Sequence, residues 1–325
     1  MSAEFFGKSG LRFDGLCPSF ECQWFCAFCV FPVEARNSLP SSISPLPAHQ
    51  FQVSFRRAGK RAILTMTDSC KLEINLAEKF PHLAHAPIVE AVIEIRARAQ
   101  VSWEESVISQ RFKSLLTDYP KSASHRQVQQ EITIVGSDQP KPIIHDLGWH
   151  GLHFQSVDEK QIARFTRDGF IFSRLQPYQD WEHLFDEAMR LWQMHIEVAK
   201  PLEVQRIGLR FINRIEMLPG EVRCEDYIIP PPQPTKDLNL PFIGFFHQDT
   251  LAVPGHPLAI NVVRTFQPPQ TPNAGIAVIL DIDASTTVAL TMNQDDLAQR
   301  LQQMRWLKNK VFFGNITEKS LNRFK

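Results

Sequence analysis

Two stretches of the chain alternate between apolar and charged residues, with the period of two that is typical of a β-strand with one buried face. In 206–216, Ile207, Leu209, Phe211 and Ile215 point to one side, and Arg206, Arg210 and Arg214 point to the other. In 88–98, Val89, Ala91, Ile93 and Ile95 form the apolar side, and Glu90, Glu94, Arg96 and Arg98 form the charged side. We therefore expect two strands that each bury one face against a core.

Other segments show weaker strand or helix patterns. Strands are expected at 131–135, 150–157, 161–166, 170–175, 242–253, 259–266 and 276–284, and the polar segment 121–130 is expected to be a loop. Asp168-Gly169 predicts a hairpin turn, because glycine accepts positive φ. Apolar residues at helical spacing predict a helix after the capping box Ser102–Glu105 and another after the cap Asp180. A last helix follows Asn293, with Leu297, Leu301, Met304, Lys308 and Val311 along one side, and Thr317 caps a short terminal turn.

The order of these elements is β-α-β-β-β-α-β followed by β-β-β-α. Short turns between the strands predict a largely antiparallel sheet with helices packed on one face, which is an α+β fold. Pro219-Gly220 and the proline run at 230–234 mark the largest internal break. We therefore expect two α+β halves, 66–220 and 221–325.

Residues 1–65 differ from the rest of the chain. They hold Cys17, Cys22, Cys26 and Cys29, a Pro/Ser-rich stretch and no sustained period. We interpret them as a disordered or non-native extension ahead of a natural start at Met66. A secretory signal is the alternative, although Glu21 and Gln23 interrupt its apolar region. The cysteines lack the two separated C-x2-4-C pairs of most structural zinc sites.

Composition adds limits of its own. The 325 residues are 43% hydrophobic and 22% charged, which is ordinary for a soluble globular protein. The formal net charge of zero gives no sign of a nucleic-acid or anionic-membrane partner. No apolar stretch reaches the roughly 18 residues of a spanning helix, and the chain beyond residue 65 shows no disulfide framework. We therefore expect a cytoplasmic protein.

The charged strand faces are the first candidate site. They carry Arg206, Arg210, Arg214, Arg96, Glu90 and Glu94, and Arg174 lies on another strand. These side chains could form cross-strand ion pairs on a solvated sheet. They could also form a groove where arginines hold a phosphate or carboxylate through paired hydrogen bonds. Our leading hypothesis is a binding or interaction module whose Arg-rich sheet face engages an anionic ligand or partner.

An enzyme is the alternative hypothesis. Asp281 and Asp283 leave one face of a strand, and together with Glu90 and Glu94 they could bind Mg²⁺ through oxygen ligands. Such a site would suit a metal-dependent phosphohydrolase acting on a phosphorylated small molecule or nucleotide. The chain has no G-x-S-x-G or G-x-x-x-x-G-K-[ST] motif.

Two further expectations concern single features of the chain. Phe242, Phe245 and Phe246 are candidates for a contact with a protein partner or with a second copy. His195, near the apolar side of its helix, is expected to be a satisfied core residue.

Three blocks of the sequence resemble a sporadically distributed TIGR family of prokaryotic proteins. They are residues 87–96 (PIVEAVIEIR), 170–178 (FIFSRLQPY) with Trp181-Glu182, and 206–215 (RIGLRFINRI). Leu280–Asp283 and Phe312–Thr317 match its C-terminal pattern, so the resemblance covers roughly 78–325. Members usually begin just before the first block, which supports a start at Met66. The family often has a histidine in the last helix where this chain has Asn309 or Lys310, and it implies no activity.

Overall fold

The computed structural model describes residues 71–133, 141–217, 223–233, 243–269 and 275–325. These residues belong to one compact unit, which begins at Leu64. The predicted extension 1–65, its cysteine cluster, Met66 and Phe242 lie outside the described residues.

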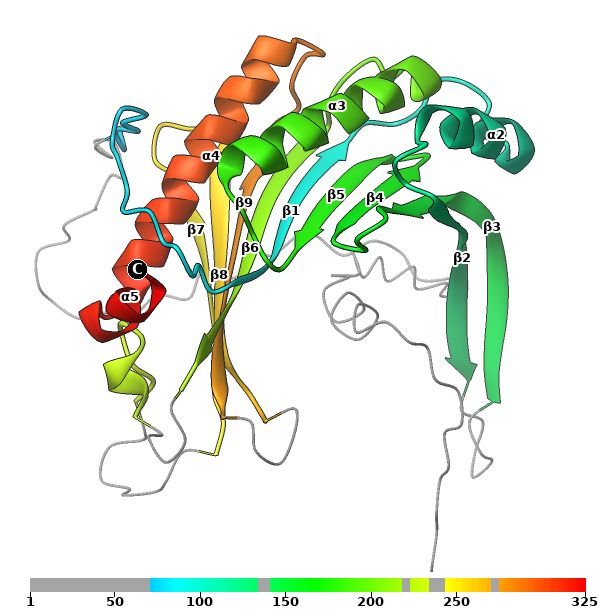
Figure 1. Ribbon diagram of the computed structural model, residues 1–325. Coiled ribbons are helices and arrows are strands. Elements are labelled where there is room, and N and C mark those ends of the chain that lie inside the picture. The colour runs from blue at the N-terminus through cyan, green and yellow to red at the C-terminus, as the bar shows by residue number, and fades with distance from the viewer. Residues whose placement is uncertain (1–70, 134–140, 218–222, 234–242, 270–274) are drawn as a thin grey trace, which may run out of the picture. The chain divides into compact units, whose positions relative to one another are not determined.

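A nine-stranded antiparallel sheet forms one layer of this unit, in the order β2-β3-β4-β5-β1-β6-β9-β8-β7 (Figure 1). The strands are β1 (Ile88–Arg96), β2 (Lys121–Thr133), β3 (Lys141–Gln155), β4 (Gln161–Thr166), β5 (Gly169–Leu175), β6 (Arg206–Glu216), β7 (Phe246–Ala252), β8 (Leu258–Gln267) and β9 (Ala277–Thr286). Strand β6 of the first predicted half pairs with β9 of the second, from Gly208 to Glu216. The sheet is therefore continuous across the two halves.

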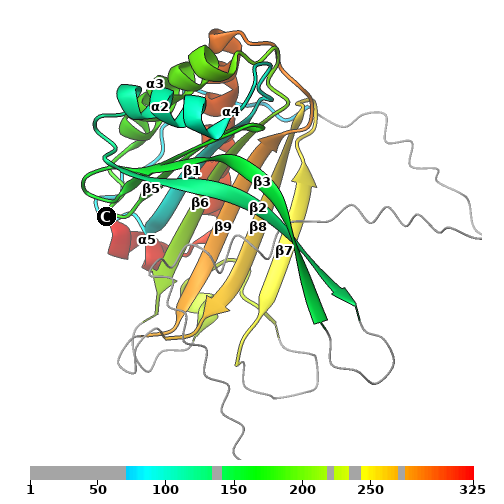
Figure 2. The same cartoon turned by 90° about the vertical axis from the view of Figure 1, so that its right-hand side faces the viewer.

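The helices α2 (Glu105–Leu115), α3 (Trp181–Ala199) and α4 (Gln294–Asn315) lie on one side of the sheet, and α5 (Glu318–Phe324) ends the chain (Figures 1 and 2). Helix α3 contacts β5, and α4 contacts β6 and β9. This arrangement confirms the predicted α+β class. No helix in the described part of the chain is long and apolar enough to cross a membrane.

The core fills the space between the helices and the sheet. The predicted apolar faces of the two alternating strands are buried there, including Ala91, Ile93 and Ile95 of β1 and Ile207, Leu209 and Phe211 of β6. The amide of His183 donates to the carboxylate of Asp180 (2.8 Å), and the amide of Ser320 donates to the hydroxyl of Thr317 (3.2 Å). Both predicted helix caps are therefore confirmed.

Two local predictions are wrong. Strand β2 covers the segment expected to be a loop, because it pairs with β3 along its whole length although its side chains at 121–129 are exposed. The capping box is absent as well, since α2 begins after Glu104, whose side chain caps no amide. Ser102 Oγ instead donates to Glu104 Oε1 (3.1 Å).

Candidate functional site

The predicted charged rows do share one face of the sheet, on the side away from the helices. Residues directly opposite each other in an antiparallel pair lie on the same face. The register sets Arg210 opposite Val92 on one side and opposite Asp283 on the other, and it sets Ile212 opposite Glu90 and Asp281. The charges of β1, β6 and β9 therefore belong to a single surface, which we call the charged face.

The arginines of the charged face are occupied by its own polar groups. Arg210 donates from Nε and Nη2 to the carboxylate of Asp281 (2.9 and 2.5 Å). Arg206 bonds to Glu94 and lies 3.5 Å from Asp283.

The remaining arginines of this face follow the same pattern. Arg96 donates to Glu94 (2.9 Å), and Arg214 pairs with Glu216 and donates to Gln267 (2.8 Å). Arg206 and Arg210 therefore form the cross-strand ion pairs of the first interpretation, whereas Arg96 and Arg214 pair with acids on their own strands.

Two groups of the charged face have shifted pKa values, each for a different reason. Burial raises the pKa of Asp283 to about 6, although Arg206 and Arg210 oppose this shift. Burial works against the charge of Arg210, but the hydrogen bonds to Asp281 outweigh it, so the pKa of Arg210 is raised. Arg210 therefore stays charged and held by Asp281.

Other predicted site residues do not join this group. Arg174 is opposite Ala91, so it points to the helix side, where it lies 3.4 Å from the carboxylate of Asp158. Among the described residues, no group of three or more His, Cys, Asp or Glu side chains is placed to hold a metal ion. Phe245 packs on Phe266 at 4.7 Å between ring centroids, whereas Phe246 is 61% exposed.

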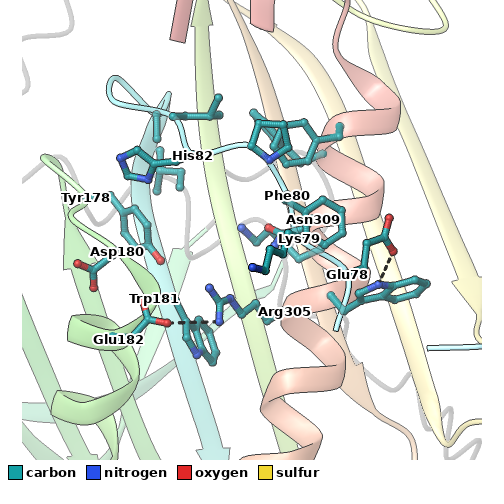
Figure 3. Close-up of a pocket in the computed structure, with 18 of the residues that line it drawn as sticks. Glu78, Lys79, Phe80, His82, Tyr178, Asp180, Trp181, Glu182, Arg305 and Asn309 are labelled. Atoms are coloured by element: carbon teal, nitrogen blue, oxygen red, sulfur yellow. Dashed lines mark hydrogen bonds and ion pairs between the residues drawn. The ribbon is translucent and has the colours of Figure 1, made fainter. Parts of the chain in front are cut away.

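A pocket of about 730 Å³ opens on the helix side of the sheet. Its walls come from the segment before β1, from the residues around the start of α3 and from α4. Figure 3 shows Tyr178 and Trp181 on one side of the pocket, Phe80 and Asn309 on the other, and Arg305 reaching between them toward Glu182. Three parts of the chain that are distant in sequence therefore enclose one space.

The segment before β1 has no regular structure, and α4 holds it in place. Phe80 stacks on Phe313 with ring centroids 5.5 Å apart. The carboxylate of Glu78 accepts hydrogen bonds from the indole of Trp306 and from Lys310, both at 2.8 Å. These contacts make the segment a fixed wall of the pocket.

Lys308 of α4 lines this pocket without a counter-ion. Its Nζ lies 3.9 Å from the centroid of the Phe211 ring, and it makes no hydrogen bond or ion pair with any residue that the structure describes. Burial and, to a smaller extent, the positive charge of Arg305 together lower the pKa of Lys308 to about 7. Lys308 is partly buried, and a partly buried lysine without an acidic partner is uncommon, so this side chain is the most unusual group of the site.

The acids around the pocket are largely engaged elsewhere. Glu78 is bound by Trp306 and Lys310, and Asp180 accepts from the amide and the ring Nδ1 of His183. Glu182 approaches Arg305 at 3.5 Å, but its side chain is 67% exposed. Among the residues that the structure describes, Lys308 therefore has no acid placed to neutralise it.

Arg305 is a second donor at the pocket. Its guanidinium lies over the ring of Trp181, 5.2 Å from the ring centroid, and both residues line the pocket. The pocket therefore holds two basic side chains next to an aromatic surface.

No family model, curated protein or solved structure matches the chain.

The three sequence blocks 87–96, 170–182 and 206–215 meet in space. Pro87 and Ile88 from the first block, Tyr178 and Trp181 from the second, and Asn213 from the third all line the pocket. Phe312 and Phe313 of the C-terminal pattern line it as well. The charged face, in contrast, takes residues from the first block, the third block and the C-terminal pattern, and takes none from the second block.

Two site residues were overlooked by reasoning from the sequence, although each leaves a signal. Lys308 stands in the apolar stripe of the last helix, between Met304 and Val311. Asn213 interrupts the apolar row of β6 between Phe211 and Ile215, and it is 1% exposed. A polar residue at a core position of an otherwise regular pattern is the sign that could have found both.

Proposed function

We propose that the protein is a binding protein for a small anionic ligand, which occupies the pocket between α3, α4 and the segment before β1. The observation that carries this proposal is the ammonium of Lys308, which sits in the pocket with no counter-ion among the described residues. A ligand carboxylate or phosphate would supply the missing charge. It would also raise the pKa of Lys308 toward its ordinary value and hold the amine protonated.

The shape and lining of the pocket support a small molecule. A volume of about 730 Å³ falls within the usual range of roughly 300–1,000 Å³ for ligand sites. Aromatic side chains at Phe80, Tyr178 and Trp181 offer apolar surface, and Lys308 and Arg305 offer positive charge. We expect an organic acid with an apolar part.

The charged face is the other place where an anionic partner could bind. Its arginines would first have to release Asp281, Glu94 or Glu216, and breaking such pairs costs part of the binding free energy. The pocket demands no such exchange at Lys308. We therefore favour the pocket over the sheet face, and binding over a metal-dependent phosphohydrolase, because the described acids form no metal-binding group.

The test is isothermal titration calorimetry of the full-length protein with lactate, benzoate and phenyl phosphate, and with benzamide as a neutral probe. We expect at least one of the anions to bind and benzamide to bind weakly or not at all. Lys308→Met keeps the length of the side chain and removes the charge. A hydrogen bond to a charged group contributes roughly 1.5–3 kcal/mol, so Lys308→Met should weaken anion binding by about 10- to 100-fold.

Lys113→Met is the matched control, because Lys113 is an exposed lysine in the last turn of α2 and does not line the pocket. It should bind the anion as the unchanged protein does. The pocket proposal fails if no anion binds, or if Lys308→Met binds as tightly as the control. Loss of binding in Arg206→Gln but not in Lys308→Met would assign the anion to the charged face.

A further inference from the structure

We propose that the ε-amine of Lys308 captures the carbonyl group of a short oxo acid as an imine, while Arg305 holds the acid group of the same molecule. This inference rests on the proposed anion site and names its ligand class. Its basis is the placement of a lysine amine and an arginine side by side in one pocket, without an acid bound to the amine.

The amine is held ready for attack by its surroundings. It rests against the face of Phe211, and no described group accepts a hydrogen bond from it. The charged form is disfavoured by burial and by Arg305, which brings the pKa of Lys308 to about 7. A large share of the amine is therefore unprotonated at neutral pH, and only the unprotonated amine has the electron pair that attacks a carbonyl carbon.

Arg305 supplies the second contact point. It precedes Lys308 by three residues in α4, so the two side chains leave the same side of the helix with Cβ atoms roughly 5–6 Å apart. Stacking on Trp181 orients its guanidinium, whose planar donors match a carboxylate. A molecule with a carbonyl group next to a carboxylate can meet both side chains at once.

The reaction needs no reagent beyond the oxo acid. The nitrogen electron pair forms a bond to the carbonyl carbon, the π electron pair of the carbonyl group moves to the oxygen, and one proton passes from the nitrogen to this oxygen through solvent, which gives a neutral carbinolamine. The hydroxyl group then takes a proton from solvent and leaves as water while the nitrogen electron pair forms the C=N bond of an iminium ion, and loss of the remaining N–H proton to solvent gives the neutral imine. One amine and one carbonyl compound give one imine and one water, with no change of oxidation state.

Two other lysines provide an internal comparison. Lys79 lines the same pocket but is exposed, and Lys310 is engaged with Glu78 and half exposed. An ordinary lysine has a pKa near 10.4, so at pH 7 the unprotonated share of Lys308 exceeds that of an ordinary lysine by roughly three orders of magnitude. Part of this advantage is lost because a less basic amine is also a weaker nucleophile.

The test incubates the full-length protein at pH 7 with pyruvate and sodium cyanoborohydride, which reduces an imine to a stable secondary amine, and maps the product by peptide mass spectrometry. We expect the label on Lys308 to exceed that on Lys79 or Lys310 by at least about tenfold. Arg305→Gln should reduce labelling by pyruvate more than labelling by acetone, a carbonyl compound without the acid. Lys308→Arg should abolish the site, and Lys113→Arg, at an exposed lysine outside the pocket, should leave it unchanged.

The outcomes separate this inference from the proposed function. Lactate has the acid but no carbonyl, so calorimetry with lactate reports the anion site alone. If lactate binds through Lys308 and pyruvate leaves no label there, the imine is refuted and the anion site stands. If Lys308 is labelled although lactate does not bind, the imine stands without the anion site. Labelling spread evenly over the exposed lysines overturns the inference.

Discussion

His195 lies on the buried side of α3 with aromatic rings around its imidazole. Trp192 and Trp103 are 5.4 and 5.9 Å away between ring centroids, and among the described residues the backbone of Ala97 is the one group that favours the charged form of the ring. His195 is fully buried, as predicted from the sequence. Burial lowers the pKa of His195 to about 4, so the folded protein keeps the imidazole neutral where the unfolded chain protonates it.

The direction of the pH dependence follows from the pKa of His195, which is about 4 in the folded protein and about 6.5 in the unfolded chain. Between about pH 4 and 6.5 the unfolded chain binds the extra proton, so the contribution of His195 to stability is lost as the pH falls through this range. We expect the free energy of unfolding to drop by about 2 kcal/mol from pH 7.5 to pH 5 through this residue alone. His195→Leu should shrink the measured difference by that amount in urea unfolding at the two pH values.

His85→Gln is the control for this measurement, since His85 is an exposed histidine before β1. Its pH dependence should match that of the unchanged protein. If His195→Leu and the control lose the same stability on acidification, the imidazole of His195 already binds protons in the folded state.

Single residues also show which features of the candidate site could be predicted from the sequence. The alternation in β1 and β6 placed Arg206, Arg210 and Arg214 together on one face correctly, because the side-chain period of a strand is fixed by its backbone. It could not show that Asp281 would neutralise Arg210, since that pairing depends on β9 joining β6 from 71 positions along the chain. Lys308 was visible as a lysine in an apolar stripe, yet only its surroundings show that it lacks an acid.

At the scale of the element, the turn between β4 and β5 determines how closely β5 approaches β1. Gly169 follows Asp168 with φ +153°, and a Cβ there would lie 2.3 Å from the backbone oxygen of Ile95 and 2.9 Å from Cα of Arg96. Backbone atoms of a central strand cannot move aside cheaply. Gly169→Ala should therefore destabilise the protein by on the order of 3 kcal/mol, measured by urea unfolding.

Gly314→Ala is the matched control, because it adds the same methyl group within α4 where no atom lies within 4 Å. Alanine favours helix by about 1 kcal/mol over glycine, so this variant should gain stability. If the stability of Gly169→Ala changes by no more than that of Gly314→Ala in size, β5 can shift away from β1.

Helices and strands whose apolar residues repeat at a regular spacing were predicted well. Strand β2, which is stabilised only by backbone hydrogen bonds to a neighbouring strand, was not. Helices α3 and α4 carry regular buried stripes and clear caps, so their starts follow from the sequence. Strand β2 has exposed side chains at 121–129 and is a strand only because β3 runs beside it. A polar strand of this kind leaves no local signal, since its structure resides in backbone hydrogen bonds to a partner.

At the scale of the molecule, the pocket could not be predicted, because its walls are chain segments brought together by the fold. The segment at 76–83 has no periodicity, and its position depends on contacts such as Phe80 with Phe313 and Glu78 with Trp306. The predicted division into two halves also missed that the halves contact each other. The same contacts tie the beginning of the first half to the last long helix of the second.

This link predicts that the two halves unfold together. Strand β6 shares its ladder with β9, and α4 of the second half packs on β6 of the first, so separating the halves would expose core residues such as Phe211 and Ile282 to water. Labelling the protein with 5-fluorotryptophan places fluorine probes at Trp192 in α3 and Trp306 in α4. We expect the folded ¹⁹F resonances of both to disappear with the same urea midpoint, as coincident probes do in a two-state transition. Trp306→Phe and Trp192→Phe assign the signals. Loss of the Trp306 signal at a clearly lower urea concentration would show that α4 leaves first, and that the pocket opens before the sheet unfolds.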